Sequence, residues 1–422
     1  MKLAALHNSE KSPENNVEEN PEENSKIILE PDPAPALSAS LVRLFLMTNN
    51  FETGGSERQF SVLAQNLRPE QFQVHLGCIQ NTGPFAQDFG DVPEFWLGSN
   101  LYGFKSWRTR LRLSRSLRRQ HIQIAHAFDF YTNLTLIPAA RFARVPVVIG
   151  SQRQLGDLLT PRQFRAQAAA FRWCDAVICN SRAAADRLAA DGLSREKLVV
   201  IGNALPAVAF APVPAALSRK PGLLRVGMVA RMNARYKNHS GFLRIAKRIS
   251  QRMPSVEFFL AGEGPLRAEL EREAQALGIG ERVVFLGDRR DIPAVMASLD
   301  VAVLTSDSES LSNVILEAMA AGLPVVAYNV GGNAELVSHE PGEHERGKLL
   351  SAGDEEGFAA AVELLLATPS MRDQFGRNAR KFAVENFSLE NVRARYEACY
   401  QSLLEKKGVR NSPGTWQPTT EA

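Results

Sequence analysis

Cysteine is scarce in this 422-residue sequence, which has only Cys78, Cys174, Cys179 and Cys399. These residues form no CxxC pair, and no histidine lies at metal-ligand spacing from them. The pattern argues against a zinc site and against a disulfide framework. Scattered single cysteines are typical of a protein from a reducing compartment.

Long apolar runs are also missing. No hydrophobic stretch approaches the roughly 18 to 20 residues that a membrane-spanning helix requires, and the first residues lack the apolar segment of a signal peptide. The formal net charge is +3, and 45% of the residues are hydrophobic against 23% charged, as in globular proteins. We therefore expect a cytoplasmic protein, and the overall charge identifies no partner.

A biased composition sets residues 1–40 apart from the rest of the chain. This segment is rich in Glu, Asn, Pro and Ser and nearly devoid of aromatic residues, so it cannot bury enough apolar surface to fold. We expect a disordered acidic tail at residues 1–40 and a second, flexible tail at residues 406–422.

Between the tails, short apolar runs alternate with helix-length segments in two successive series. This alternation is typical of domains in which helices cover a parallel sheet. The first series covers residues 41–205, and residues 206–221 interrupt it with four prolines, as a linker does. The second series covers residues 222–385, and a helix at 386–405 is expected to pack back toward the first domain. The predicted fold class is α/β, with two Rossmann-like, doubly wound parallel-sheet domains that face a cleft.

Glycines follow three of the predicted strands, the third of which ends before Gly331 and Gly332. Ligands of such sheets bind beyond the carboxyl ends of the strands, so these loops are candidate sites. Gly54 and Gly55 stand where a backbone can approach a ligand closely and where free N–H groups at a helix start favour an anionic oxygen. Gly262 and Gly264 flank Glu263 after another apolar run. A plain tight turn would use the same glycines in the first two of these places.

Two cations follow the first strand of the second series. Arg231 and Lys237 could neutralise a diphosphate, because arginine offers a planar fork to phosphate oxygens and lysine a mobile point charge. Surface cations beside a helix are common, so a solvated pair is the alternative.

The strongest signal lies in residues 306–337. Glu309 falls in the loop before a predicted helix, and Glu317 falls inside that helix among apolar neighbours. A carboxylate on a largely buried helix is costly unless paired, and the hydroxyls of a ribose or another sugar are suitable donors to it. Capping oxygens and free N–H groups come from the residues between loop and helix, Ser310, Leu311, Ser312 and Asn313. A stripe of solvent-facing glutamates is the alternative.

Together these residues resemble the family-4 retaining glycosyltransferases of the GT-B fold, from about Val42 to about Tyr400. Glu309 and Glu317, with seven residues between them and AAGLPVVA after them, match the signature of that family. Supporting matches are the TGGSE loop, the Arg231 and Lys237 pair, the AGEGP turn, the FLGDRRDIP segment and the IGNAL strand end.

The resemblance implies a role for each part of the donor site. Arg231 and Lys237 would bind the donor diphosphate. Glu317 would bind the ribose, and Glu309 would contact hydroxyls of the transferred sugar.

The resemblance also implies how the base is held and how the reaction proceeds. The base would lie on FLGDRRDIP, partly against the backbone near Arg290 and Ile292. A hexosyl-type group would pass from a nucleotide sugar to a glycan or lipid-linked acceptor in polysaccharide or glycolipid biosynthesis, with retained configuration and with no metal or cofactor. In such a front-face reaction the departing phosphate oxygen helps to deprotonate the acceptor, and the cations stabilise the leaving group.

The first domain departs from the family pattern. Many relatives have a second histidine in a His-x-His segment and another near the next strand end, where this chain has Phe128 and Gln152. His126 remains as a candidate catalytic group, beside Asp129 and Arg153. A structural histidine is the alternative.

Residues 105–119 are strongly basic and include Trp107 and Leu111. As a helix this stretch would present cations and apolar side chains to an anionic membrane, which would place the protein peripherally on its inner face. A solvated helix face is the alternative, and no nucleic-acid motif accompanies the charge.

Two other classes compete with a transferase. A sugar-nucleotide epimerase would need acid and base groups that act on the sugar ring, and no matching motif is present. A catalytically silent nucleotide-sugar-binding protein is made plausible by the missing histidines.

Overall fold

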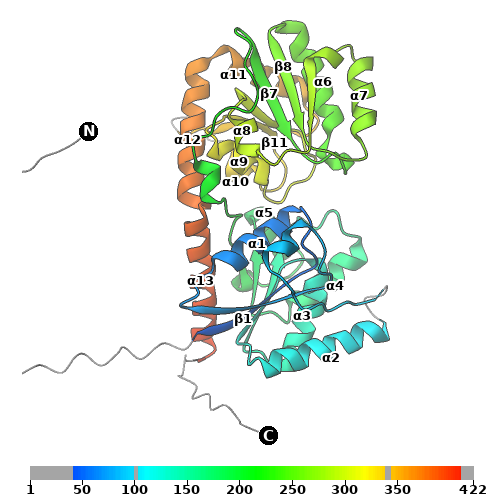
Figure 1. Ribbon diagram of the computed structural model, residues 1–422, viewed down its shortest axis with the longest axis vertical. Helices are drawn as coiled ribbons and strands as arrows, with labels where there is room; N and C mark the ends of the chain where they lie inside the picture. Colours follow the sequence, from blue (N-terminus) through cyan, green and yellow to red (C-terminus); the bar gives the residue numbers. More distant parts are fainter. Residues whose placement is uncertain (1–40, 99–102, 338–343, 410–422) are drawn as a thin grey trace, which may run out of the picture. The chain divides into compact units, whose positions relative to one another are not determined.

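The computed structural model describes residues 41–98, 103–337 and 344–409 (Figure 1). Of the two predicted tails, residues 1–40 and 410–422 lie outside this description. Two six-stranded sheets, with helices packed beside them, make up the described part of the chain. Every strand pair within them is parallel, so the predicted fold class is confirmed. Both sheets belong to one compact unit.

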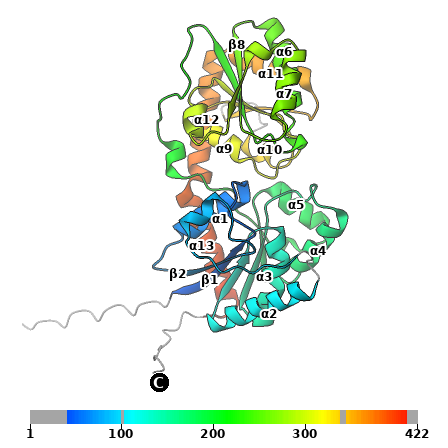
Figure 2. The same ribbon diagram turned by 45° about the vertical axis from the view of Figure 1, so that its right-hand side comes forward.

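The first sheet has the strand order β2-β1-β3-β4-β5-β6. Its four central strands are buried and consist largely of apolar residues, because helices cover their faces. The strands are β1 (Val42–Thr48), β2 (Phe72–Cys78), β3 (Ile124–Ala127), β4 (Val147–Gln152), β5 (Ala176–Cys179) and β6 (Leu198–Val200). The helices are α1 (Gly55–Asn66), α2 (Phe104–Arg119), α3 (Phe130–Ala143), α4 (Pro161–Phe171) and α5 (Arg182–Ala190). Figure 2 shows α2 and α3 lying side by side.

The second sheet has the strand order β12-β11-β10-β7-β8-β9. In both sheets the order reverses beside the first strand, which is the point where doubly wound folds bind ligands. The strands are β7 (Leu224–Val229), β8 (Val256–Ala261), β9 (Val283–Gly287), β10 (Val301–Leu304), β11 (Val325–Tyr328) and β12 (Gly347–Leu350). The helices are α6 (His239–Arg252), α7 (Arg267–Ala276), α8 (Ile292–Met296), α9 (Asn313–Ala320), α10 (Asn333–Leu336), α11 (Glu355–Ala367) and α12 (Pro369–Phe387).

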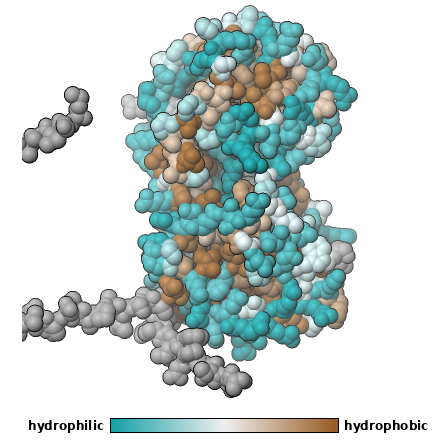
Figure 3. Space-filling view, viewed as in Figure 1, coloured by the Kyte–Doolittle hydropathy of each residue, from teal (hydrophilic) through white to brown (hydrophobic). Residues whose placement is uncertain are grey.

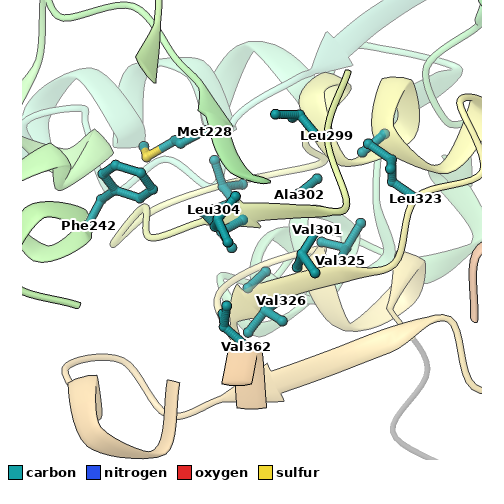
Figure 4. Close-up of a cluster of buried hydrophobic side chains, with 14 of the residues drawn as sticks. Met228, Phe242, Leu299, Val301, Ala302, Leu304, Leu323, Val325, Val326 and Val362 are labelled. Carbon is teal, nitrogen blue, oxygen red and sulfur yellow. The ribbon is translucent and has the colours of Figure 1, made fainter. Parts of the chain in front are cut away.

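The core of the second domain is built from strands in the middle of its sheet and from helices that pack against them. Figure 4 shows Met228 of β7, Leu304 of β10 and Val326 of β11 in one cluster with Phe242 of α6 and Val362 of α11. Each of these side chains is almost completely buried. Such packing holds the strand ends, and hence the loops that follow them, in fixed positions.

The last helix, α13 (Leu389–Lys406), packs on the first domain although it follows α12 of the second. Tyr396 and Tyr400 lie in the same core as β1 and β3. The ribbon views show α13 running beside the first sheet (Figures 1 and 2). Glu397, only 1% exposed, accepts hydrogen bonds from the backbone N–H and the guanidinium of Arg68. The final helix therefore completes the first domain.

None of the helices in the described part of the chain is both long and apolar enough to cross a bilayer. On the face drawn in Figure 3, hydrophobic residues form separate patches among hydrophilic ones.

Candidate active site

The predicted glycine pair lies between β1 and α1. A Cβ on Gly54 would lie 1.9 Å from Glu57 Oε2, because the carboxylate of Glu57 folds back over the loop. A Cβ on Gly55 would lie 3.0 Å from Asn313 Nδ2 at the start of α9. Gly55 thus allows the first domain to approach the predicted donor loop closely.

A pocket of about 210 Å³ opens at the carboxyl ends of β1, β3 and β4. Its lining consists of Asn49, Ser56, Glu57, Asp129, Phe130, Tyr131, Ser151, Gln152, Arg153, Gln154 and Gln167. Gln152 accepts a hydrogen bond from the amide nitrogen of Gln167, and the buried Oε1 of Gln167 has no protein partner. The wall of the pocket therefore includes two buried glutamine amides.

Two carboxyl groups in this pocket, those of Asp129 and Glu57, have a raised pKa. Asp129 caps α3 by accepting from the N–H groups of Tyr131 and Thr132, and it also accepts from Asn49 N at 2.7 Å. Burial raises the pKa of Asp129 to about 6 despite these hydrogen bonds. Burial also raises the pKa of Glu57, against the opposing charges of Arg153 and of Arg231 in the second domain.

His126 is fully buried beneath the pocket and does not belong to its lining. Its Nδ1 lies 2.8 Å from the hydroxyl of Tyr400, and its Nε2 lies 2.8 Å from Ser151 Oγ. Burial lowers the pKa of His126 to about 3, so the ring stays neutral. In this arrangement both ring nitrogens are already occupied, and His126 joins α13 to the first sheet.

Arg153 reaches the pocket from the end of β4. Its guanidinium stacks over the ring of Phe128, 4.8 Å from the centroid. One nitrogen, Nη2, donates to Asn203 Oδ1 at 2.5 Å. The two candidates that the sequence placed beside His126, Asp129 and Arg153, are thus the ones that line the pocket.

The predicted cations of the second domain follow β7. Arg231 is exposed, whereas Lys237 ends a short 3-10 turn, Arg235–Lys237, before α6. Lys237 Nζ lies 2.6 Å from Glu309 Oε1, with the two side chains 22% and 11% exposed. The structure therefore brings two predicted catalytic residues into direct contact.

The AGEGP turn supports this loop. The backbone N–H of Met232 donates to the carbonyl of Glu263 at 3.0 Å. Gly262 has φ +141°, and a Cβ there would lie 2.0 Å from the carbonyl oxygen of Ala230. A glycine is needed at this position because the turn packs directly against the strand end that carries Arg231. The side chain of Glu263 itself pairs with Arg267 at 2.6 Å.

Glu317 occupies the second turn of α9, whose N-cap is Ser312. It is 15% exposed, and its Oε1 lies 2.6 Å from the guanidinium of Arg58 in α1. Burial raises the pKa of Glu317, and the charge of Arg58 opposes this shift. The sequence predicted Glu317 but missed Arg58, although Arg58 directly follows the quoted TGGSE motif.

The loop between β10 and α9, residues 305–312, also contacts the first domain. Ser310 donates to Asn180 Oδ1 at 2.6 Å, and the carbonyl of Leu311 accepts from Asn203 Nδ2 at 3.2 Å. Asn203 also donates to Asn313 Oδ1 at 2.7 Å. Asn203 was missed as a functional residue, although it lies in the IGNAL segment.

The residues predicted to bind the base lie on another segment of the chain, the one that follows β9. Arg290 is exposed, and Ile292 is the first residue of α8. The neighbouring Arg289 and Asp291 form an ion pair at 2.5 Å. No cluster of three or more His, Cys, Asp or Glu side chains suited to a metal ion occurs in the described ranges.

Comparison with known families accounts for both halves of the chain. Residues 53–207 match the family described as Glycosyltransferase Family 4, and residues 224–368 match Glycosyl transferases group 1. The chain belongs to these glycosyltransferases. The matched segments contain the glycine loop, the cation pair and both glutamates.

Relatives with assigned names support the placement. This glycosyltransferase is 32% identical over 243 residues to the lipopolysaccharide core biosynthesis glycosyltransferase LpsE of Rhizobium meliloti, covering 58% of this chain and 67% of that protein. It is 28% identical over 345 residues to the Escherichia coli UDP-Gal:alpha-D-GlcNAc-diphosphoundecaprenol alpha-1,3-galactosyltransferase, covering 76% of this chain and 86% of that enzyme.

Among solved structures, HepE from Anabaena in complex with UDP superposes with a TM-score of 0.73 at 22% identity. The match covers 86% of this glycosyltransferase and 100% of HepE. It establishes that the two proteins share the two-domain fold.

Proposed function

We propose that this glycosyltransferase moves a hexosyl-type group from a nucleotide-sugar donor to a glycan or lipid-linked acceptor, with retained configuration and without a metal ion. The observation that carries the proposal is the 2.6 Å contact between Lys237 and Glu309 at the switch point of the second sheet, with Arg231 on the same loop as Lys237. A cation and a carboxylate held together there suit a diphosphate and a sugar hydroxyl respectively.

The chemistry follows from these groups. The bond between the anomeric carbon and the phosphate oxygen breaks, and Lys237 and Arg231 stabilise the charge that develops on the leaving diphosphate. The acceptor oxygen forms its bond to the anomeric carbon on the same face, and its proton passes to the departing phosphate oxygen. Glu309 accepts a hydrogen bond from a hydroxyl of the transferred sugar, and Glu317 accepts from the ribose.

We assign the acceptor to the pocket of the first domain. Asp129 and Arg153 line it and would touch the acceptor, whereas His126 is covered. The donor and acceptor named for the Escherichia coli relative, UDP-Gal and a diphosphoundecaprenol-linked sugar, support a uridine nucleotide and a lipid-linked acceptor. The lipopolysaccharide role named for LpsE and the UDP bound to HepE point the same way.

A lipid-linked acceptor calls for a surface that meets a membrane, and we assign this role to α2. Phe104 and Trp107 are 74% and 54% exposed, and their rings stack on one another at 6.3 Å. Exposed cations on the same helix are Lys105, Arg108, Arg112, Arg115, Arg118 and Arg119. Exposed aromatic side chains among cations suit the inner face of an anionic bilayer.

Vesicle co-sedimentation tests this surface. We expect the protein to pellet with vesicles that contain anionic lipid and to pellet less after Trp107→Ala combined with Arg108→Ala and Arg115→Ala. Equal sedimentation with neutral and anionic vesicles would refute the assignment.

The proposed reaction is tested first by thermal shift in EDTA against UDP-, GDP-, ADP- and TDP-sugars. A ligand at 100 times its dissociation constant stabilises a protein by about 2.7 kcal/mol, so one class of nucleotide should raise the melting temperature selectively. Turnover with that donor is then followed by NMR of the product, where an unchanged anomeric configuration is expected. An inverted product would refute retention, and binding without turnover on a broad acceptor panel would favour the silent binding protein.

A further inference from the structure

Asn203 links the acceptor pocket to the predicted donor loop. It follows β6, is 3% exposed, and bonds to both domains through one side chain. Its Oδ1 accepts from Arg153 Nη2 at 2.5 Å, and its Nδ2 donates to the Leu311 carbonyl and to Asn313 Oδ1 at 3.2 and 2.7 Å. The orientation of the amide is fixed by chemistry, because a guanidinium only donates and a carbonyl only accepts.

Arg153 is held on the pocket side of this link. Stacking on Phe128 fixes the plane of the guanidinium, and Nη1 donates to the Tyr396 hydroxyl at 3.3 Å. A movement of Arg153 caused by a ligand in the pocket would therefore pull on Asn203. Such a signal is geometric, because it passes through contacts between side chains.

The other end of the link lies where the donor is expected. Leu311 and Asn313 stand at the start of α9, two and four positions after Glu309, which contacts Lys237. A shift of the Leu311 carbonyl or of the Asn313 side chain changes the N–H groups that α9 presents to the diphosphate. Asn203 thus contacts the part of the loop that would meet the nucleotide.

We propose that Asn203 is a positioning residue that couples Arg153 in the acceptor pocket to the loop between β10 and α9, so that acceptor and nucleotide strengthen each other's binding. This inference rests on the proposed function. Coupling free energies are reciprocal, so an acceptor that tightens nucleotide binding is itself bound more tightly when the nucleotide is present. A change at Arg153 that breaks the link should therefore weaken nucleotide binding, even though Arg153 belongs to the acceptor pocket.

The test measures the dissociation constant of UDP by calorimetry for the full chain and its variants. If UDP does not stabilise the wild type, GDP, ADP or TDP is used, whichever does. Arg153→Lys and Asn203→Ala should each weaken binding about threefold to tenfold, the range of one net hydrogen bond. The double variant should be no weaker than Asn203→Ala alone, because both changes break the same link.

Arg187 provides a matched control. It stacks on Phe164 at 5.2 Å and pairs with Asp191 at 3.1 Å, so Arg187→Lys removes similar interactions on α5 of the same domain. We expect this variant to bind UDP like the wild type. Additive losses in the double variant, or equal affinities in Arg153→Lys and Arg187→Lys, would overturn the coupling.

A second variant separates loss of the link from a general loss of stability. Asn203→Asp keeps an acceptor for Arg153 but loses both donors to the loop, so it should weaken nucleotide binding as much as Asn203→Ala at a temperature where both are folded. Wild-type affinity in Asn203→Asp would show that the loop does not depend on this residue. If the wild type binds none of the four nucleotides, the proposed function fails and the inference fails with it.

Discussion

Gly331 offers a test of how tightly the position of Glu309 controls turnover. It follows β11 with φ +51°, and a Cβ there would lie 1.7 Å from the carbonyl oxygen of Glu309. Real Cβ atoms stay at least 3.0 Å from such an atom. Gly331→Ala therefore forces the backbone that carries Glu309 to move by more than about 1 Å, a displacement that can cost roughly 100-fold in rate.

The variant also carries a conformational cost. An alanine in the left-handed region costs about 1 to 2 kcal/mol, which lowers stability without involving the site. Gly353→Ala is the matched control, because Gly353 has φ +83° and a Cβ there would have no neighbour within 4 Å. The two variants share the backbone strain, so the difference between them isolates the contact with Glu309.

The assay is donor turnover per folded molecule, measured beside the melting temperature of each variant. We expect both variants to lose stability, and only Gly331→Ala to lose turnover about 100-fold relative to the wild type. Equal turnover in Gly331→Ala and Gly353→Ala would refute the reasoning, because Glu309 would then tolerate displacement or have no role in the reaction.

Three further outcomes follow from the charged groups. Lys237→Ala should lower turnover at least about tenfold, since a charged hydrogen bond contributes ~1.5 to 3 kcal/mol. Lys220→Ala, at an exposed lysine, is the control, and equal turnover in the two variants would contradict the role of Lys237. Burial lowers the pKa of His126 from 6.5 to about 3, so the unfolded chain takes up a proton that the folded chain excludes. As the pH falls from 6.5 to 5, His126 should therefore lower the free energy of unfolding by about 2 kcal/mol. Urea titrations of His126→Gln should not show this loss. Arg58→Ala should raise the pKa of Glu317 further, because burial raises this pKa and Arg58 opposes the rise. UDP binding should then weaken more at pH 5 than at pH 8. The same loss of UDP affinity at both pH values would refute a role of the Glu317 charge in UDP binding.

The sequence was sufficient for the fold class. Apolar runs such as that of β1 alternate with helical segments, and this pattern alone predicts buried parallel strands. It also predicted that Glu317, a carboxylate among apolar neighbours on a helix, needs a partner, and Arg58 is that partner in the structure. The roles assigned to Glu309 and Glu317 stay predictions.

The partners themselves could not be predicted. Arg58 lies 259 positions from Glu317, and Tyr400 lies 274 positions from His126, so no local period links the residues of either pair. The sequence of a short apolar strand does not show whether its histidine faces a pocket or the core. The docking of α13 decides this for His126, and it depends on how the whole chain folds.

The docking of α13 also sets the order in which the protein can be completed during synthesis. The side chains that satisfy His126 and Arg68 belong to Tyr400 and Glu397, which a ribosome adds after the whole second domain. Until they emerge, the nascent first domain exposes the apolar surface that Tyr396 and Tyr400 later cover. The first half of the chain should therefore depend on chaperones longest, although it is made first.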